Sequence, residues 1–460
     1  MSVRMVDIYL FRAKEDERFG DSCQSLENRS LSRSCSSSTK KRLLQQLRRI
    51  SFDVEFVNNL KWSARVLKIL IAGIDGYLGW TLASHLADRG HDVAGIDNGF
   101  RRDWVSEMAS ISAIPIADLD TRVAAVERQF GRPLTVVKGD LTDANIVNNL
   151  VDSFRPDSIV QLGECPSAPY SMIDAKHAIF VQTNNLTSTF NLMFAIKDIV
   201  PEAHLVKLGT MGEYGTPNLD IPEGFFEIEY RGRKDRLPFP RQAGSFYHWS
   251  KVHGSNNIMF ASKIWGLRAT DIMQGVVYGT RNDAMGTDPD MRTRLDFDQS
   301  FGTVINRFVC SAVIGEKLTL YGNGHQKRGF LPLRDSMQCL TLAIENPADA
   351  GEYRVFNQFE EVYSVVELAN KVREIGNTAG LDVNITNYQN PRIEAQDHRY
   401  SPDHKHLLDL GYVPTHDMAS EISAMFEDLI PQRDRISKHR DGLVPDIHWD
   451  GSKGRVNLIK

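Results

Sequence analysis

The sequence predicts an α/β protein in which a doubly wound parallel sheet carries a smaller, intercalated C-terminal lobe. Two observations lead to this prediction. From residue 67 onward, short runs of aliphatic and β-branched residues alternate with amphipathic segments of helical period, as in parallel sheets whose strands are joined by helices. The first apolar run also ends in a turn that contains three glycines.

The first expected strand runs from Leu67 to Gly73, and the helix after it extends to about Gly90. Glycines at such a turn permit a sharp bend, close approach of the backbone to a pyrophosphate, and close packing of helix on strand. The spacing is G-x-x-G-x-x-G, and a glycine triplet alone also occurs in ordinary strand-to-helix turns. We expect a Rossmann-type turn that binds a dinucleotide through the following residues: Gly73, Asp75, Gly76, Tyr77, Leu78 and Gly79.

The second expected strand, Asp92 to Asp97, ends in an acid about 20 residues after the glycine turn. A carboxylate at this position can accept a hydrogen bond from the ribose 2′-hydroxyl of NAD. We therefore place Asp97 and Asn98 at the cofactor and predict NAD. Arg101 and Arg102 follow closely and leave open a site for the 2′-phosphate of NADP.

Four later segments are predicted as short buried strands: residues 134–140, 157–163, 204–210 and 268–275. Ligands of open α/β sheets bind at the carboxyl ends of the strands, where Asp140, Leu141 and Thr210 are placed. Asn184 and Asn185 are expected to begin the helix before the 204–210 strand. Helix capping is the alternative role for Asp140 and Asn184.

Tyr247 and Lys251 have the spacing Y-x-x-x-K, which places both side chains one turn apart on the same helix face. A lysine ammonium beside a phenol stabilises the phenolate, so the tyrosine can exchange a proton with an alcohol. The bare motif is more often a solvated helix face. When the Y-x-x-x-K motif comes after a dinucleotide-binding turn in the same chain, it indicates redox chemistry between an alcohol and a ketone.

These residues together resemble the extended short-chain dehydrogenase/reductase family, also known as the NAD-dependent epimerase/dehydratase family, whose members act on nucleotide sugars. Longer strings are similar to those of its UDP-sulfoquinovose synthase branch, and the resemblance covers about residues 67 to 430. The strings are residues 167–174, 208–217, 245–253, 274–279 and 354–358.

The resemblance implies tightly bound NAD, UDP-glucose as substrate, and sulfite. The implied reaction is oxidation at C4, loss of water across C5 and C6, addition of sulfite at C6, and return of the hydride to C4. It also implies roles for several residues. Thr210, Tyr247 and Lys251 are catalytic; Asn185, Gln274 and Val277 lie at the cofactor; and Gln274, Arg328 and Arg392 bind the nucleotide sugar with Thr210.

Two departures from the family pattern bear on the later steps. Cys165-Pro166 stands where the family carries Gln-Arg, so a cation for sulfite is missing. Met211-Gly212 stands where sugar 4,6-dehydratases carry Asp-Glu, an acid/base pair. The remaining candidates for elimination chemistry are His248, Glu164, Cys165 and Glu213. We expect His248 to change charge between pH 5 and 8 and to hold sulfite, although a structural histidine is the alternative.

Two other functions remain open from the residues. One is a UDP-sugar dehydratase or 4-epimerase that shares oxidation at C4 and never uses sulfite. The other is a non-catalytic NAD-binding protein, against which the Thr210, Tyr247 and Lys251 set argues.

Composition agrees with an enzyme of this kind. The chain has 460 residues and a net charge of -5, which gives no nucleic-acid signal. The five cysteines show no C-x-x-C, so neither a disulfide framework nor a metal site is expected. No apolar run is long enough to span a membrane. We also expect a homodimer.

The predicted domains are an extension over residues 1–66, an NAD-binding domain over 67–300, a substrate lobe with returning sheet segments over 301–430, and a tail over 431–460. The extension is rich in serine and basic residues from residue 28 to 50, which is typical of a flexible or targeting segment. Acids before residue 28 argue against targeting. The predicted location is therefore the cytoplasm, with a plastid as the alternative.

Overall fold

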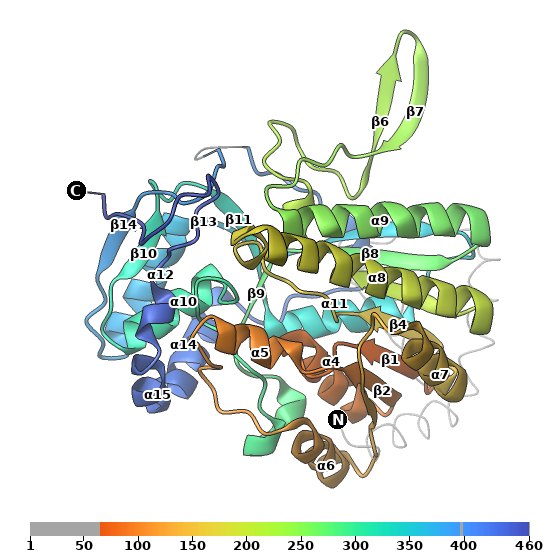
Figure 1. The fold of residues 1–460 in the computed structure, drawn as a ribbon, viewed down its shortest axis with the longest axis horizontal. Helices are drawn as coiled ribbons and strands as arrows, with labels where there is room; N and C mark the ends of the chain where they lie inside the picture. Colours follow the sequence, from red (N-terminus) through yellow and green to blue (C-terminus); the bar gives the residue numbers. More distant parts are fainter. Residues whose placement is uncertain (1–64, 396–398, 460) are drawn as a thin grey trace, which may run out of the picture. The chain divides into compact units, whose positions relative to one another are not determined.

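The computed structural model describes residues 65–395 and 399–459 (Figure 1). By its contacts the chain separates into residues 1–65 and 66–460. The prediction for the N-terminal extension lies almost wholly outside the described residues. The second unit contains all of the strands that the sequence predicts.

A seven-stranded sheet forms the centre of this unit, with strand order β12-β8-β5-β4-β1-β2-β3. All six pairings are parallel, and the order reverses between β1 and β4. The predicted doubly wound sheet is thereby confirmed. The strands are β1 Lys68–Ala72, β2 Asp92–Asp97, β3 Thr135–Lys138, β4 Ser158–Gln161, β5 His204–Leu208, β8 Arg268–Gln274 and β12 Tyr353–Gln358.

One strand differs from its predicted environment. β3 is predicted as buried, but Thr135 and Lys138 are exposed and the two valines between them are only partly buried. The reason is its position, because β3 pairs with β2 alone and forms the edge of the sheet.

Helices cover both faces of the sheet (Figure 1). α7, α8 and α9 pack side by side on one face, and α4, α6 and α11 lie on the other. The bounds are α4 Tyr77–Asp88, α5 Phe100–Glu107, α6 Leu119–Phe130, α7 Ala144–Phe154, α8 Ala175–Ile199, α9 Phe246–Trp265 and α11 Leu333–Glu345.

The start of α8 differs from the prediction for Asn184 and Asn185. Asp174 caps this helix by accepting a hydrogen bond from the His177 amide at 2.9 Å. Both asparagines therefore lie in the middle of the helix, buried against neighbouring elements. Asp140 is not a helix cap either, because Asp143 caps α7.

The second lobe has its own hydrophobic core and two small sheets, with strand orders β10-β14 and β13-β11-β9. Ile436 and Leu443, from the predicted tail, are buried in this core. The strands are β9 Val276–Tyr278, β10 Leu318–Tyr321, β11 Lys327–Pro332, β13 Glu361–Ser364 and β14 Ile385–Tyr388. The helices are α10 Val304–Val313, α12 Val365–Thr378, α13 Lys405–Asp409, α14 Met418–Leu429 and α15 Arg433–Ser437.

An antiparallel hairpin, β6 Phe225–Tyr230 and β7 Arg233–Pro238, extends away from the sheet (Figure 1). The sequence did not predict this hairpin. The chain returns from it through residues 239–245 to the start of α9. No helix in the described ranges combines the length and apolar character needed to cross a membrane.

Candidate active site

A cavity of about 690 Å³ lies at the carboxyl ends of the central strands and is lined by residues of both lobes. Most of the predicted site residues line it: Gly73, Gly76, Tyr77, Leu78, Gly79, Asp97, Asn98, Arg101, Asp140, Leu141, Thr210, Tyr247, His248, Lys251, Gln274, Val277, Arg328 and Arg392. Three predicted residues, Asp75, Arg102 and Asn185, lie outside the lining. The fold thus brings the glycine turn, the Tyr-Lys pair and the two arginines to one cavity.

The glycine turn fits a diphosphate. Gly73 has φ of 93°, and a Cβ there would lie 2.6 Å from the backbone of Gly163. A Cβ on Gly79 would lie 2.0 Å from the Gly73 carbonyl oxygen. Gly76 precedes α4 and no side chain caps the helix, so its first amides can donate to an anion. These observations match the backbone cradle that a dinucleotide requires.

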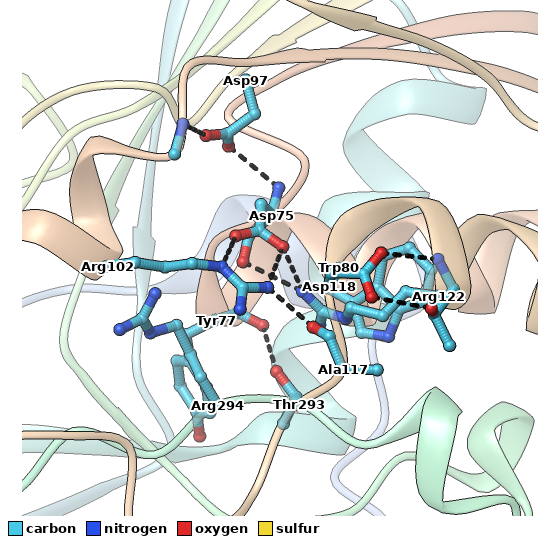
Figure 2. Close-up of polar contacts among 12 residues, drawn as sticks. Asp75, Tyr77, Trp80, Asp97, Arg102, Ala117, Asp118, Arg122, Thr293 and Arg294 are labelled. Carbon is cyan, nitrogen blue, oxygen red and sulfur yellow. Dashed lines mark hydrogen bonds and ion pairs between the residues drawn. The ribbon is translucent and has the colours of Figure 1, made fainter.

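Asp97 is fixed at the edge of this turn (Figure 2). One carboxylate oxygen accepts from the Gly99 amide at 2.8 Å, and the other accepts from the Asp75 amide at 2.9 Å. Burial raises the pKa of Asp97, which the two amide bonds partly offset. Each oxygen keeps capacity for a further hydrogen bond, so a ribose hydroxyl can bind here.

Asp75 belongs to a buried ion-pair network behind the turn (Figure 2). Arg102 donates two hydrogen bonds to its carboxylate at 2.7 and 2.9 Å, and Arg122 donates one at 2.6 Å. Arg122 is fully buried and its guanidinium lies 4.1 Å from the Trp80 ring centroid. Asp75 and Arg102 therefore stabilise the turn from outside the cavity. Arg101, which does line the cavity, pairs with Asp296 at 2.7 Å.

Asn185 also acts from outside the cavity. Its side-chain oxygen accepts from the Cys165 amide at 2.8 Å, and its nitrogen donates to the Cys165 carbonyl at 3.2 Å. The same nitrogen donates to Ser250 on α9 at 2.9 Å. Asn185 thus fixes the chain after β4 against the catalytic helix. Gln274 lines the cavity and donates to Gln358 at 2.9 Å.

Tyr247 and Lys251 lie on α9 as predicted, but the charge of Lys251 is already engaged. Its ammonium donates to Glu164 and to the Leu208 carbonyl oxygen, the latter at 2.6 Å. The pKa of Tyr247 is raised above its usual range, mainly by burial and next by Glu164. Glu164 offsets the charge of Lys251, so this arrangement reduces the expected stabilisation of the phenolate by the lysine.

Thr210 caps the short 3-10 turn Met211–Glu213 after β5 and lines the cavity. Its hydroxyl oxygen accepts from the Gly212 amide at 3.1 Å. Glu213 accepts from the Thr210 amide at 3.3 Å and pairs with Arg241 and the buried Lys207 behind the turn. Glu213 thus fixes Thr210 from behind, and it does not line the cavity.

Of the four candidates for elimination chemistry, His248 and Glu164 line the cavity, whereas Cys165 and Glu213 do not. Cys165 is fully buried, and burial raises the pKa of its thiol to about 12. A thiolate is therefore unfavourable at that position near neutral pH.

His248 packs directly against Gly212. A Cβ on Gly212 would lie 2.4 Å from the imidazole Nε2, so a larger residue there would collide with the ring. His248 thus occupies space next to the position that carries a glutamate in sugar dehydratases. Its Nδ1 lies 2.9 Å from the Ser245 hydroxyl.

The predicted charge change of His248 between pH 5 and 8 is wrong. Burial lowers the pKa of His248 to about 3, and the cations Arg392, Arg328 and Lys251 act in the same direction. The imidazole is therefore neutral across that range. A neutral imidazole can take a proton, but it supplies no positive charge for sulfite.

The second lobe contributes three arginines to the cavity, Arg307, Arg328 and Arg392. Arg328 donates to Glu394 at 2.7 Å, and Arg307 donates to the Tyr321 hydroxyl at 2.7 Å. Burial lowers the pKa of Arg392, with Glu394 opposing that shift. Three guanidinium groups and one carboxylate, that of Glu394, line this end of the cavity, so it suits a ligand of about two negative charges. The sequence did not indicate Arg307, because it lies within α10 without a motif and only the fold brings it here.

Comparisons with known proteins agree with this geometry. Residues 69–357 match the model of the NAD dependent epimerase/dehydratase family. The chain is 44% identical over 384 residues to the UDP-sulfoquinovose synthase of Sulfolobus acidocaldarius, covering 83% of this chain and 98% of that protein. It is also 44% identical over 407 residues to the chloroplastic UDP-sulfoquinovose synthase of Spinacia oleracea, covering 88% and 84%.

Solved structures of lower identity share the fold. One is UDP-glucose 4-epimerase of Thermotoga maritima with UDP-glucose, at 18% identity and a TM-score of 0.58, covering 79% of this chain and 98% of that one. Another is UDP-glucuronic acid 4-epimerase of Bacillus cereus with UDP-glucuronic acid and NAD, at 19% identity and a TM-score of 0.59, covering 80% and 99%. With the family match and both relatives above 40% identity, the chain belongs to the NAD dependent epimerase/dehydratase family and, within it, to the UDP-sulfoquinovose synthase family.

Proposed function

We propose that the protein is an NAD-dependent synthase that converts UDP-glucose and sulfite to UDP-sulfoquinovose. The observation that carries the proposal is the single cavity that joins the glycine turn, the Thr210, Tyr247 and Lys251 set, and the arginine-rich end. The 44% identity to two UDP-sulfoquinovose synthases narrows the reaction to this branch of the family.

The proposed cofactor is NAD, which would be held by the glycine turn and by Asp97. When bound, NAD accepts the C4 hydride of the sugar and later returns it, so a closed cycle needs no exchange of cofactor. Both arginines that could serve NADP are paired with carboxylates, Arg101 with Asp296 and Arg102 with Asp75. This pairing supports NAD over NADP.

In the proposed mechanism, Tyr247 removes the proton of the C4 hydroxyl while Thr210 hydrogen-bonds the same oxygen. The raised pKa of Tyr247 disfavours its phenolate, so Lys251 must shift from Glu164 toward the phenol as substrate binds. Glu213 keeps Thr210 in place during this step through the Thr210 amide.

For the elimination, we assign removal of the C5 proton to His248 because it lines the cavity. Its lowered pKa makes the imidazole a weak base, so the step requires the bound diphosphate to offset the charges of Arg328 and Arg392. The His248 imidazolium then gives this proton to the C6 hydroxyl, which leaves as water, and a C5–C6 double bond forms beside the C4 ketone. The sulfur of hydrogen sulfite then bonds to C6, and the proton of hydrogen sulfite passes through His248 to C5. Glu164 is the alternative acid/base group, since it also lines the cavity.

A UDP-sugar dehydratase is the second candidate function, because Pro166 lines the cavity at the position of the family arginine. Purified protein incubated with UDP-glucose, with and without sulfite, separates the two. A product whose mass includes the sulfonate supports the synthase. An enone or C5 proton exchange that sulfite does not alter would support the dehydratase instead.

We further propose a homodimer that forms through the paired helices α8 and α9. Their outer faces carry large apolar side chains that are 38–65% exposed: Ile179, Phe190, Phe194, Phe246, Trp249, Phe260 and Ile264. At helical spacing these residues form one stripe on each helix, which is typical of an interface. Light scattering, which measures the mass in solution, tests this proposal. A wild-type protein with the mass of a monomer, unchanged in Phe260→Glu, would refute it.

The cellular location stays a proposal. The spinach relative is named as chloroplastic, which favours the plastid alternative. The acids among residues 15–27 favour the cytoplasm. Fusion of residues 1–66 to a fluorescent protein would distinguish the two.

A further inference from the structure

The C-terminal segment contributes Trp449 to the lining of the cavity and is fixed on both sides of this residue. Asp446 exchanges two hydrogen bonds with Gln299, at 2.6 and 2.8 Å. Farther along, Leu458 pairs with Tyr388 of β14 in a β-bridge, and the Gln389 amide donates to the Asn457 carbonyl at 2.8 Å. Residues 446–458 therefore form a strap between two attachment points.

Trp449 lies three residues after the first attachment point of this strap and lines the cavity. Its indole Nε1 donates to the Gly244 carbonyl at 2.8 Å, on the loop that returns from the β6–β7 hairpin to α9. Its backbone amide donates to the Pro391 carbonyl at 2.9 Å. Trp449 thus connects the loop before α9, which contains Gly244, to the loop that contains Pro391 and Arg392.

Trp449 also contacts Arg392 itself. The guanidinium carbon of Arg392 lies 5.1 Å from the indole ring centroid, within the range of a cation–π contact. The Nε of Arg392 is buried and has no hydrogen-bond partner among the described residues. A flat ring against one face of a guanidinium leaves its edge nitrogens free to bind an anion.

We propose that Trp449 is a substrate-positioning residue that holds Arg392 toward the diphosphate of the nucleotide sugar and closes that end of the cavity. The inference rests on the proposed function, since a nucleoside diphosphate is the ligand. Trp449 acts through Arg392 and Gly244, and it has no part in proton transfer. It should therefore affect the binding of UDP and leave the chemical step unchanged.

The test uses UDP alone as probe, measured by calorimetry, together with KM and kcat for UDP-glucose. Trp449→Ala should weaken UDP at least tenfold and raise KM, with kcat changed less than about twofold. Trp449→Phe keeps a ring over Arg392 but loses the bond to Gly244, so it should recover part of the affinity. Trp265→Ala is the matched control, because Trp265 packs on Phe194 at the far end of α9 and does not line the cavity; it should change neither quantity.

A double-mutant cycle with Arg392→Ala separates positioning from a general loss of structure. If Trp449 acts through Arg392, the two substitutions together should weaken UDP no more than about twofold beyond Arg392→Ala alone. Full additivity, or UDP binding that Trp449→Ala leaves intact, would overturn the inference. Protein that shows these UDP effects yet makes no sulfonated product would support the inference and refute the proposed synthase. Wild-type protein that binds no UDP would refute both.

Discussion

The ammonium of Lys251, which is expected to serve the phenol of Tyr247, is bound to the carboxylate of Glu164. Both side chains are buried, and one carboxylate oxygen of Glu164 has no partner among the described residues. Glu164 is also the second-largest cause, after burial, of the raised pKa of Tyr247. The ion pair therefore opposes ionisation of the catalytic tyrosine until Lys251 moves.

Glu164→Gln should lower the pKa of Tyr247, because it removes a nearby negative charge and releases Lys251. A reaction that depends on the phenolate becomes faster as pH rises through this pKa. The rising limb of the pH–rate profile for C4 oxidation should accordingly move to lower pH. Glu164→Asp keeps the charge and should keep the wild-type profile. A limb that moves to higher pH in Glu164→Gln would contradict the assignment.

Tyr247→Phe removes the hydroxyl that takes the C4 proton and leaves the ring in place. We expect kcat to fall by about 10²–10⁴-fold, the range of general acid–base contributions, with the affinity for UDP-glucose nearly unchanged. Arg328→Ala should do the opposite, raising KM with little effect on kcat, because Arg328 lines the arginine-rich end. Steady-state kinetics measure both, and near-normal turnover in Tyr247→Phe would exclude this tyrosine as the base.

Asp97→Ala should weaken NAD binding by about 1–3 kcal/mol, the cost of leaving a buried polar partner without its hydrogen bond. Asp97 also accepts the Gly99 and Asp75 amides, so Asp97→Asn is the milder control that keeps one acceptor. The wild-type protein is expected to retain NAD through purification, which absorbance after denaturation measures. Protein that arrives without cofactor and binds NADP more tightly would count against the proposal.

The sequence predicted the sheet and the Tyr247–Lys251 helix because both depend on local periodicity and spacing. The sequence did not reveal that Asp75 and Arg102 lie outside the cavity lining. Their position depends on an ion pair between Asp75 and Arg122, and Arg122 lies on a separate helix, α6. Arg307 and Trp449 carry no motif and reach the cavity only through packing of the second lobe. The pKa of His248 depends on burial and on arginines 80 or more residues away, which no local pattern can show.

Arg122→Met should destabilise the fold, because it leaves the buried Asp75 carboxylate with Arg102 as its one remaining ion-pair partner (Figure 2). Because Arg102 remains, the loss should be smaller than the ~3–5 kcal/mol that an uncompensated buried charge costs. Burial alone would raise the pKa of Asp75, but Arg102 and Arg122 outweigh it and lower the pKa below 3.8. Arg128→Met, at an exposed pair with Asp288, should leave the unfolding midpoint unchanged.

The lowered pKa of Asp75 sets the sign of the pH effect. A group with a lowered folded pKa stabilises the fold above its unfolded pKa, and this contribution is lost as pH falls through the folded pKa. The difference in unfolding free energy between wild type and Arg122→Met should therefore be full at pH 5–7 and shrink below about pH 4. Urea titrations at several pH values measure it. A difference that grows in acid would show that Asp75 is not the group involved.

Pro166→Arg tests whether the cavity is built for sulfite. The family pattern also has glutamine at the position of Cys165, but Cys165 is fully buried and a longer side chain there would overpack its surroundings. Pro166 lines the cavity, so an arginine at this position alone can reach the ligand.

Since the guanidinium of the introduced arginine stays charged at every working pH, the KM for sulfite should fall at least tenfold at both pH 6 and pH 8, after correction for the ionisation of sulfite. Pro166→Gln, uncharged and also polar, is the control and should give a much smaller change. If Pro166→Arg leaves sulfite use unchanged while elimination proceeds, the cavity has no place for the anion, and the dehydratase becomes the better assignment.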